Sequence, residues 1–228
     1  MQAQHPIPAL TAKPARRPFH QKLVQFVRLR SEDDLLWYQQ RYQTVGGSVV
    51  SLDYLRSARV YIAFHRGNVL GGFIINTTGQ LRYLEPFNQS QLAAFTEQFG
   101  IQFDQTAEIT GIWLDARSKT HATRIQVYCA SIWFAILSGK QFLLGGAKTE
   151  SIVSLYREVM TIDLFAGQVT DLSGHSFSSF LCFQSRWKVV INAVSWLFDE
   201  YVGTPRKYVP RKSRSTVGAM KGSVKPLV

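Results

Sequence analysis

The chain has 228 residues, of which 46% are hydrophobic and 13% aromatic, so it can fill the core of one sizeable domain, and disorder throughout is excluded. No uninterrupted apolar stretch approaches the length of a membrane span, and the N-terminus lacks the charged-then-apolar pattern of a signal peptide. We therefore expect a cytoplasmic protein without a transmembrane segment. The formal net charge is +11.

The excess positive charge lies at the two ends of the chain. Residues 1–22 hold four basic residues and residues 203–228 hold seven, without an acidic residue in either segment. We expect a flexible basic arm over 1–21, a globular domain over 22–202 and a disordered basic tail over 203–228. Segments of this charge attract nucleic acid or an anionic membrane surface.

The first half of the chain is predicted to alternate between strands and helices. Ser31 is an N-cap candidate, and the three acidic residues that follow favour the start of a helix. Residues 81–84 are a candidate extension of the sheet. The expected strands are 22–29, 59–64 and 69–75, and the expected helices are 31–45, 52–56 and 88–99.

The second half begins with a strand, helix, strand, helix pattern. The apolar run 109–114 reads as a buried strand, and a helix reaching Leu137 follows the polar turn 115–121. This helix is apolar nearly all round, so we expect it to be buried. A second strand and helix follow, and the two strands should be parallel. The second strand is expected over 141–144 and the second helix over 151–159. The remaining elements are strands over 162–169 and 176–183 and an amphipathic helix over 187–201.

This order of elements resembles the GNAT acyltransferase superfamily over residues 22–183. The resemblance implies an α/β (α+β) fold with a mixed, mostly antiparallel central sheet and helices on both faces. In that family a loop of pattern R/Q-x-x-G-x-G/A follows the fourth strand and holds the pyrophosphate of coenzyme A. Backbone N–H groups at a helix N-terminus are suited to bind such an anion.

The loop pattern fits this sequence in two registers. Residues 117–122 match it with Thr120 in place of a glycine. Alternatively, residues 114–116 match the family's V-D-P lead-in, and the pattern then runs from Lys119 to Arg124. A glycine of the pattern is replaced in both registers. The residues implied to bind acyl-CoA are Leu114, Arg117, Ser118, Lys119, Thr120, His121 and Ala122, with Thr149 from the loop and helix after the fifth strand.

A second family landmark is N-x-x-A-x-x-L-Y, whose tyrosine protonates the departing thiolate. Residues 149–156 keep its final Leu-Tyr pair and have Thr149 in the asparagine position. The resemblance therefore implies that Tyr156 is the catalytic acid. Several branches of the family place a carboxylate at the start of the fourth strand, as the base or as the group that orients the acceptor, which implies one of these roles for Glu108. Residues 108–112 also have a faint similarity to the E-L-S-R-F segment of acyl-homoserine-lactone synthases, which take long acyl chains, often from acyl carrier protein.

Two functions follow from these observations. The first is an N-acyltransferase that moves an acyl group from acyl-CoA, or acyl carrier protein, to a small-molecule or peptide amine. The second is an inactive GNAT-like binding or scaffold module whose basic tails engage nucleic acid or another polyanion. The histidines show no metal-ligand spacing, so we expect no metal.

Overall fold

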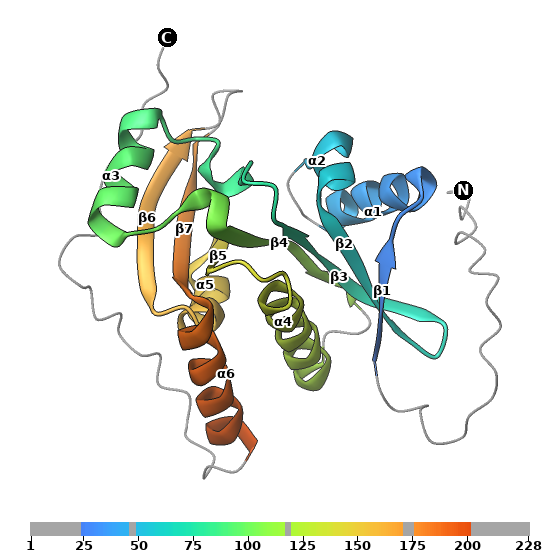
Figure 1. The fold of residues 1–228 in the computed structure, drawn as a ribbon. Helices are drawn as coiled ribbons and strands as arrows, with labels where there is room; N and C mark the ends of the chain where they lie inside the picture. Colours follow the sequence, from blue (N-terminus) through green and yellow to red (C-terminus); the bar gives the residue numbers. More distant parts are fainter. Residues whose placement is uncertain (1–23, 46–48, 117–119, 171–175, 202–228) are drawn as a thin grey trace. The chain divides into compact units, whose positions relative to one another are not determined.

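The computed structural model describes residues 24–45, 49–116, 120–170 and 176–201. The strands are β1 (Gln25–Leu29), β2 (Arg59–His65), β3 (Asn68–Asn76), β4 (Thr106–Leu114), β5 (Phe142–Ala147), β6 (Ile162–Thr170) and β7 (Ser176–Ser185) (Figure 1). The helices are α1 (Glu32–Thr44), α2 (Leu52–Ser57), α3 (Gln89–Phe99), α4 (His121–Ile136), α5 (Glu150–Arg157) and α6 (Arg186–Tyr201), with 3₁₀ turns η1 (Arg82–Leu84) and η2 (Phe103–Gln105).

The strands are arranged in a mixed, seven-stranded sheet in the order β1-β2-β3-β4-β5-β7-β6. Antiparallel pairing joins β1 to β2, β5 to β7 and β6 to β7, whereas β4 and β5 are parallel. The predicted α/β class and the predicted parallel pair are therefore confirmed. The predictions for the basic arm and the basic tail concern residues outside those described.

The chain divides into two compact units, and each unit has its own hydrophobic core. Of the described residues, those up to 74 and those within 111–130 form the first unit, and those within 75–110 and 131–201 form the second. In the first unit, the core beneath α1 and α2 includes Leu35, Leu55 and Trp113. In the second unit, the core includes Phe95 of α3 and Phe165 of β6.

The strand β4 contains a local irregularity at Gly111. This residue has φ +60°, a left-handed conformation that suits glycine, and its carbonyl accepts a 2.8 Å hydrogen bond from the Tyr38 hydroxyl. A Cβ atom at this position would lie 2.6 Å from Cδ1 of Ile74. Both the backbone angle and the close packing therefore require glycine here.

Replacing Tyr38 with phenylalanine is expected to lower the free energy of unfolding by about 1–2 kcal/mol, because the buried Gly111 carbonyl loses its hydroxyl donor. Equilibrium urea denaturation measures the change. Tyr42 is half-buried and stacked on Tyr38, so Tyr42→Phe is the matched control, with an expected loss below about 0.5 kcal/mol. Equal losses in the two variants would contradict this role for the Tyr38 hydroxyl.

Two sequence-based expectations are wrong. Residues 81–84 do not extend the sheet. Residues 82–84 form η1, because the N–H groups of Arg82 and Tyr83 bond to the side chain of Glu108 instead of a strand. The helix α4 is not buried all round, since Trp133 is 57% exposed and Leu137, just beyond its end, is 58% exposed. An apolar pattern does not distinguish a buried face from an exposed apolar one.

Candidate functional site

In the second unit, the parallel ladder between β4 and β5 is short. It pairs Thr106 with Phe142 and ends where Ile109 pairs with Gly145. The strand β5 continues to Ala147, and its last two residues pair with β7. The backbone edge of β5 at Gly146 is thus available to a partner other than a strand.

Glu108 lies within this ladder and is fully buried. Its Oε1 accepts a 2.7 Å hydrogen bond from the N–H of Tyr83, and its Oε2 accepts a 3.1 Å hydrogen bond from the N–H of Arg82. Backbone N–H groups compensate the cost of burying a carboxylate. Glu108 therefore holds the turn η1 against β4.

Tyr83 is brought to the end of the ladder by this turn. Its hydroxyl donates a 2.8 Å hydrogen bond to the carbonyl oxygen of Gly146, one residue beyond the last β4–β5 pair. A Cβ atom at Gly146 would lie 3.0 Å from the Tyr83 ring, so the two residues are in close contact. Sequence reasoning missed Tyr83, because its partners lie 25 and 63 residues away and no local motif marks it.

Tyr156 belongs to α5, whose N-cap is Thr149, and it is 3% exposed. Its ring lies against Gly145: a Cβ atom there would be 2.7 Å from both Cδ1 and Cε1 of the tyrosine. The N–H groups of Val159 and Met160 bond to the Tyr156 carbonyl and close the end of the helix. The absence of a side chain at Gly145 therefore creates the space that the Tyr156 ring occupies.

Glu108 and Tyr156 belong to opposite faces of the sheet. Leu144 contributes to the core that contains Phe95 of α3, whereas Gly145, the next residue, faces Tyr156 of α5. Successive residues of a strand point to opposite faces, and Glu108 is paired with Leu144. Groups on the two faces can act on one molecule only where the strands part, which is beyond Ile109 and Gly145.

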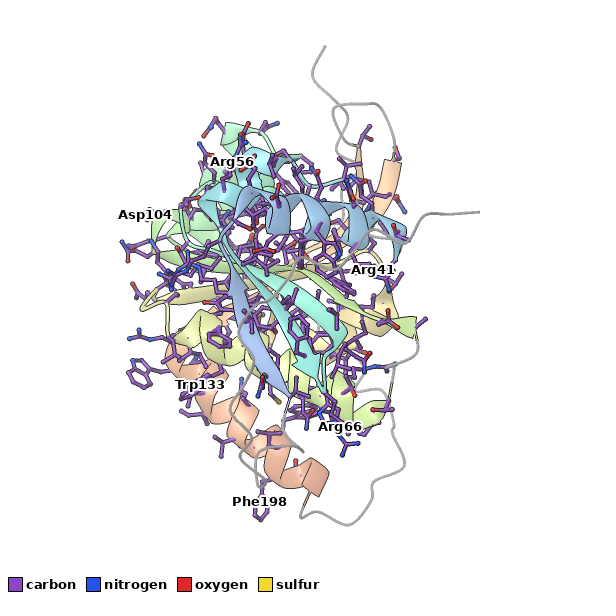
Figure 2. All side chains as sticks on the ribbon, turned by 90° about the vertical axis from the view of Figure 1, so that its right-hand side faces the viewer. Arg41, Arg56, Arg66, Asp104, Trp133 and Phe198 are labelled. Carbon is purple, nitrogen blue, oxygen red and sulfur yellow. The ribbon has the colours of Figure 1, made fainter. Side chains whose placement is uncertain are left out.

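In the first unit, the end of β4 is anchored by Asp115. Its N–H donates a 2.7 Å hydrogen bond to the Leu70 carbonyl, and its carboxylate forms an ion pair with Arg41. The Arg41 guanidinium also lies 5.7 Å from the centre of the Trp113 ring, a cation–π arrangement. These contacts fix the point where the chain leaves β4, next to Leu114 of the predicted coenzyme A site (Arg41 is labelled in Figure 2).

The helix α4 begins immediately after Thr120. The Thr120 hydroxyl accepts a 3.1 Å hydrogen bond from the N–H of Thr123, and its carbonyl accepts one of 3.0 Å from the N–H of Arg124. Thr120 therefore acts as the N-cap, and His121 and Ala122 are exposed in the first turn. Residues 117–119, which include Arg117, Ser118 and Lys119, lie outside the described part of the chain.

Among the described residues, no group of three or more His, Cys, Asp or Glu side chains is placed to hold a metal ion. None of the helices in that part of the chain is long and apolar enough to cross a membrane.

The fold of this chain is similar to the folds of several solved structures. One is FeeM, an N-acyl amino acid synthase from uncultured soil microbes, with a TM-score of 0.58, 15% identity and coverage of 77% of this chain and 97% of FeeM. Another is the structure of mutant forms of the spermidine/spermine N-acetyltransferase SpeG from Vibrio cholerae, with a TM-score of 0.51, 10% identity and coverage of 75% of this chain and 98% of SpeG. Protein-family models and the sequences of curated proteins give no match.

Proposed function

The chain has the GNAT acyltransferase fold, and from this premise we propose that it is an N-acyltransferase that moves an acyl group from acyl-CoA, or from acyl carrier protein, to an amine. The observation that carries the proposal is the packing of Tyr156 on Gly145, at the point where β4 and β5 part. A thioester placed there would have Tyr156 on one side and Glu108 with Tyr83 on the other.

The proposed reaction is a direct attack of the amine on the thioester. The amine nitrogen forms a bond to the carbonyl carbon, Glu108 takes the amine proton directly or through water, and the carbon–sulfur bond breaks. Tyr156 donates its proton to the departing thiolate.

We assign the pyrophosphate of the donor to the start of α4. The first N–H groups of a helix favour an anion, and the exposed residues Thr120, His121 and Ala122 leave them accessible. Arg117, Ser118 and Lys119 precede this turn in the sequence and supply two positive charges. The family resemblance also implies donor-binding roles for Leu114, at the end of β4, and for Thr149, the N-cap of α5.

The acceptor class is proposed from the comparison with FeeM, an N-acyl amino acid synthase that matches over 97% of its length. Free amino acids are therefore the first acceptors to test, and polyamines, the acceptors named for SpeG, are the second. The faint resemblance of residues 108–112 to acyl-homoserine-lactone synthases favours a long acyl chain.

The test is a transfer assay with the full-length protein. Acetyl-CoA and palmitoyl-CoA are each incubated with single amino acids and with polyamines, free thiol is followed spectroscopically, and N-acyl products are identified by mass spectrometry. Enzyme-dependent formation of one N-acyl product supports the proposal. If neither donor, nor palmitoyl-acyl carrier protein, yields product with either acceptor class, the proposal is rejected in this form.

Replacing Glu108 with glutamine is expected to reduce kcat/KM by about 100-fold and to lower the free energy of unfolding by about 1–3 kcal/mol. The amide retains one acceptor oxygen but turns its NH₂ group towards a backbone N–H of η1. The kinetic change is measured with the donor and acceptor found above, and the stability change by urea denaturation.

The control separates loss of the base from loosening of the turn. Leu84 is a buried residue of the same turn, and Leu84→Val should cost about 1 kcal/mol of stability while leaving the carboxylate in place. If Leu84→Val reduces kcat/KM as strongly as Glu108→Gln, Glu108 is a positioning residue and the assignment as base is wrong.

A further inference from the structure

The last helix, α6, exposes a stripe of large apolar side chains. Trp187, Ile191, Val194 and Phe198 are 69%, 64%, 63% and 61% exposed. Their spacing of four, three and four residues places them along one side of the helix. Figure 2 shows Phe198 pointing away from the α6 ribbon. Exposed apolar patches of this kind mark contact surfaces.

The opposite side of α6 attaches the helix to its unit. Val189 is fully buried, and the side-chain amide of Asn192 donates a 3.1 Å hydrogen bond to the Val159 carbonyl. The N–H of Arg186 donates a 2.8 Å hydrogen bond to the Gln141 carbonyl. The stripe is therefore not the face through which α6 packs on β5 and β7.

The chain that follows α6 is strongly basic. Residues 202–228 carry seven Lys or Arg residues and no Asp or Glu. A run of four to eight basic residues next to an amphipathic helix is attracted to anionic lipid headgroups. The binding of an amphipathic helix to a bilayer strengthens with the apolar area that it buries and with its electrostatic attraction to anionic lipids.

We propose that the apolar stripe of α6 docks this protein on the surface of a lipid bilayer, and that the positive charge of residues 202–228 makes the protein prefer anionic lipids. The four apolar side chains enter the boundary between headgroups and acyl chains, with the aromatic rings of Trp187 and Phe198 at the two ends of the stripe. The helix lies along the surface and does not cross the membrane.

Two other occupants fit these features less well. A second copy of the chain would cover the stripe but would bring the same uncompensated positive charge, without a complement to it. A nucleic acid would neutralise the basic segment but would leave the apolar stripe in water, because phosphate contacts dominate such binding. A bilayer with anionic lipids complements both features.

The test is co-sedimentation of the full-length protein with vesicles of phosphatidylcholine containing about 30% phosphatidylglycerol, compared with phosphatidylcholine alone. Wild type should bind the anionic vesicles. The double variant Trp187→Ser/Phe198→Ser and a chain ending at residue 202 should each bind at least about tenfold more weakly. Val49→Ser is the control: Val49 is 75% exposed and lies in the other unit, so binding should not change.

Circular dichroism verifies that each variant is folded. If the double variant binds the anionic vesicles as wild type does, the basic segment acts alone and the proposal is wrong. The proposal is equally wrong if wild type does not bind the vesicles. A dimer that light scattering detects for wild type but not for the double variant would then identify a second copy as the partner, and binding of an oligonucleotide would identify nucleic acid. Vesicle binding is measured without acyl transfer, so this test is independent of the proposed catalytic function.

Discussion

Replacing Tyr156 with phenylalanine is expected to lower kcat by about 100-fold. General acid catalysis contributes about 10²–10⁴-fold to a rate, and the substitution removes the one proton that Tyr156 can give to a departing thiolate. The ring itself remains, so its packing on Gly145 and the burial of its apolar surface are preserved. Steady-state kinetics with the donor and acceptor found in the transfer assay measures the change.

The control for this prediction is Tyr61→Phe. Tyr61 is also a buried tyrosine, at 8% exposure, but it stacks on Phe73 in the first unit. Its replacement should change kcat by less than about twofold. A Tyr156→Phe variant that is as active as Tyr61→Phe would show that Tyr156 is a packing residue, and the acid would then have to be sought elsewhere, with Tyr83 first.

Replacing Gly145 with alanine should damage both stability and activity, although the substitution adds a single methyl group. The new Cβ atom would lie 2.7 Å from two carbons of the Tyr156 ring, so the ring must move. Overpacking of this kind costs about 1–3 kcal/mol of stability. A displacement of about 1 Å in a catalytic group can lower a rate about 100-fold. Urea denaturation and steady-state kinetics measure the two effects.

A double-mutant cycle tests whether Gly145 acts through the Tyr156 hydroxyl. If it does, Gly145→Ala should have almost no further effect on kcat in a Tyr156→Phe background, because the hydroxyl that it displaces is already absent. The loss of stability should persist, since the ring is still crowded. Additive effects on kcat would instead indicate that the alanine disturbs the site by another route.

The sequence was sufficient for the order of the elements and for the class of fold. Turn signals, helix caps and apolar periodicity are local, and they correctly predicted the two parallel strands β4 and β5 and the helix that separates them. The residues Glu108 and Tyr156 were proposed from a family resemblance, and the structure gives each of them defined contacts. Their catalytic roles remain predictions.

What the sequence missed depends on contacts between distant residues. The turn at residues 82–84 forms because two backbone N–H groups meet a carboxylate about 25 residues later in the chain, which no local pattern encodes. Tyr83 reaches the end of the β4–β5 ladder for the same reason. The exposed stripe on α6 was predicted only as part of an amphipathic helix, because periodicity shows which residues share a face but not whether that face is covered.

The most direct test of the central claim is calorimetric titration of the protein with acetyl-CoA and palmitoyl-CoA. We predict saturable one-to-one binding that is about tenfold weaker in Arg117→Ala/Lys119→Ala, because each basic side chain contributes to holding the pyrophosphate. Arg66→Ala, an exposed arginine of the β2–β3 turn, should bind as wild type does. Absence of binding at ligand concentrations near 1 mM, an affinity weaker than about −4 kcal/mol, would contradict an acyl-CoA-dependent transferase.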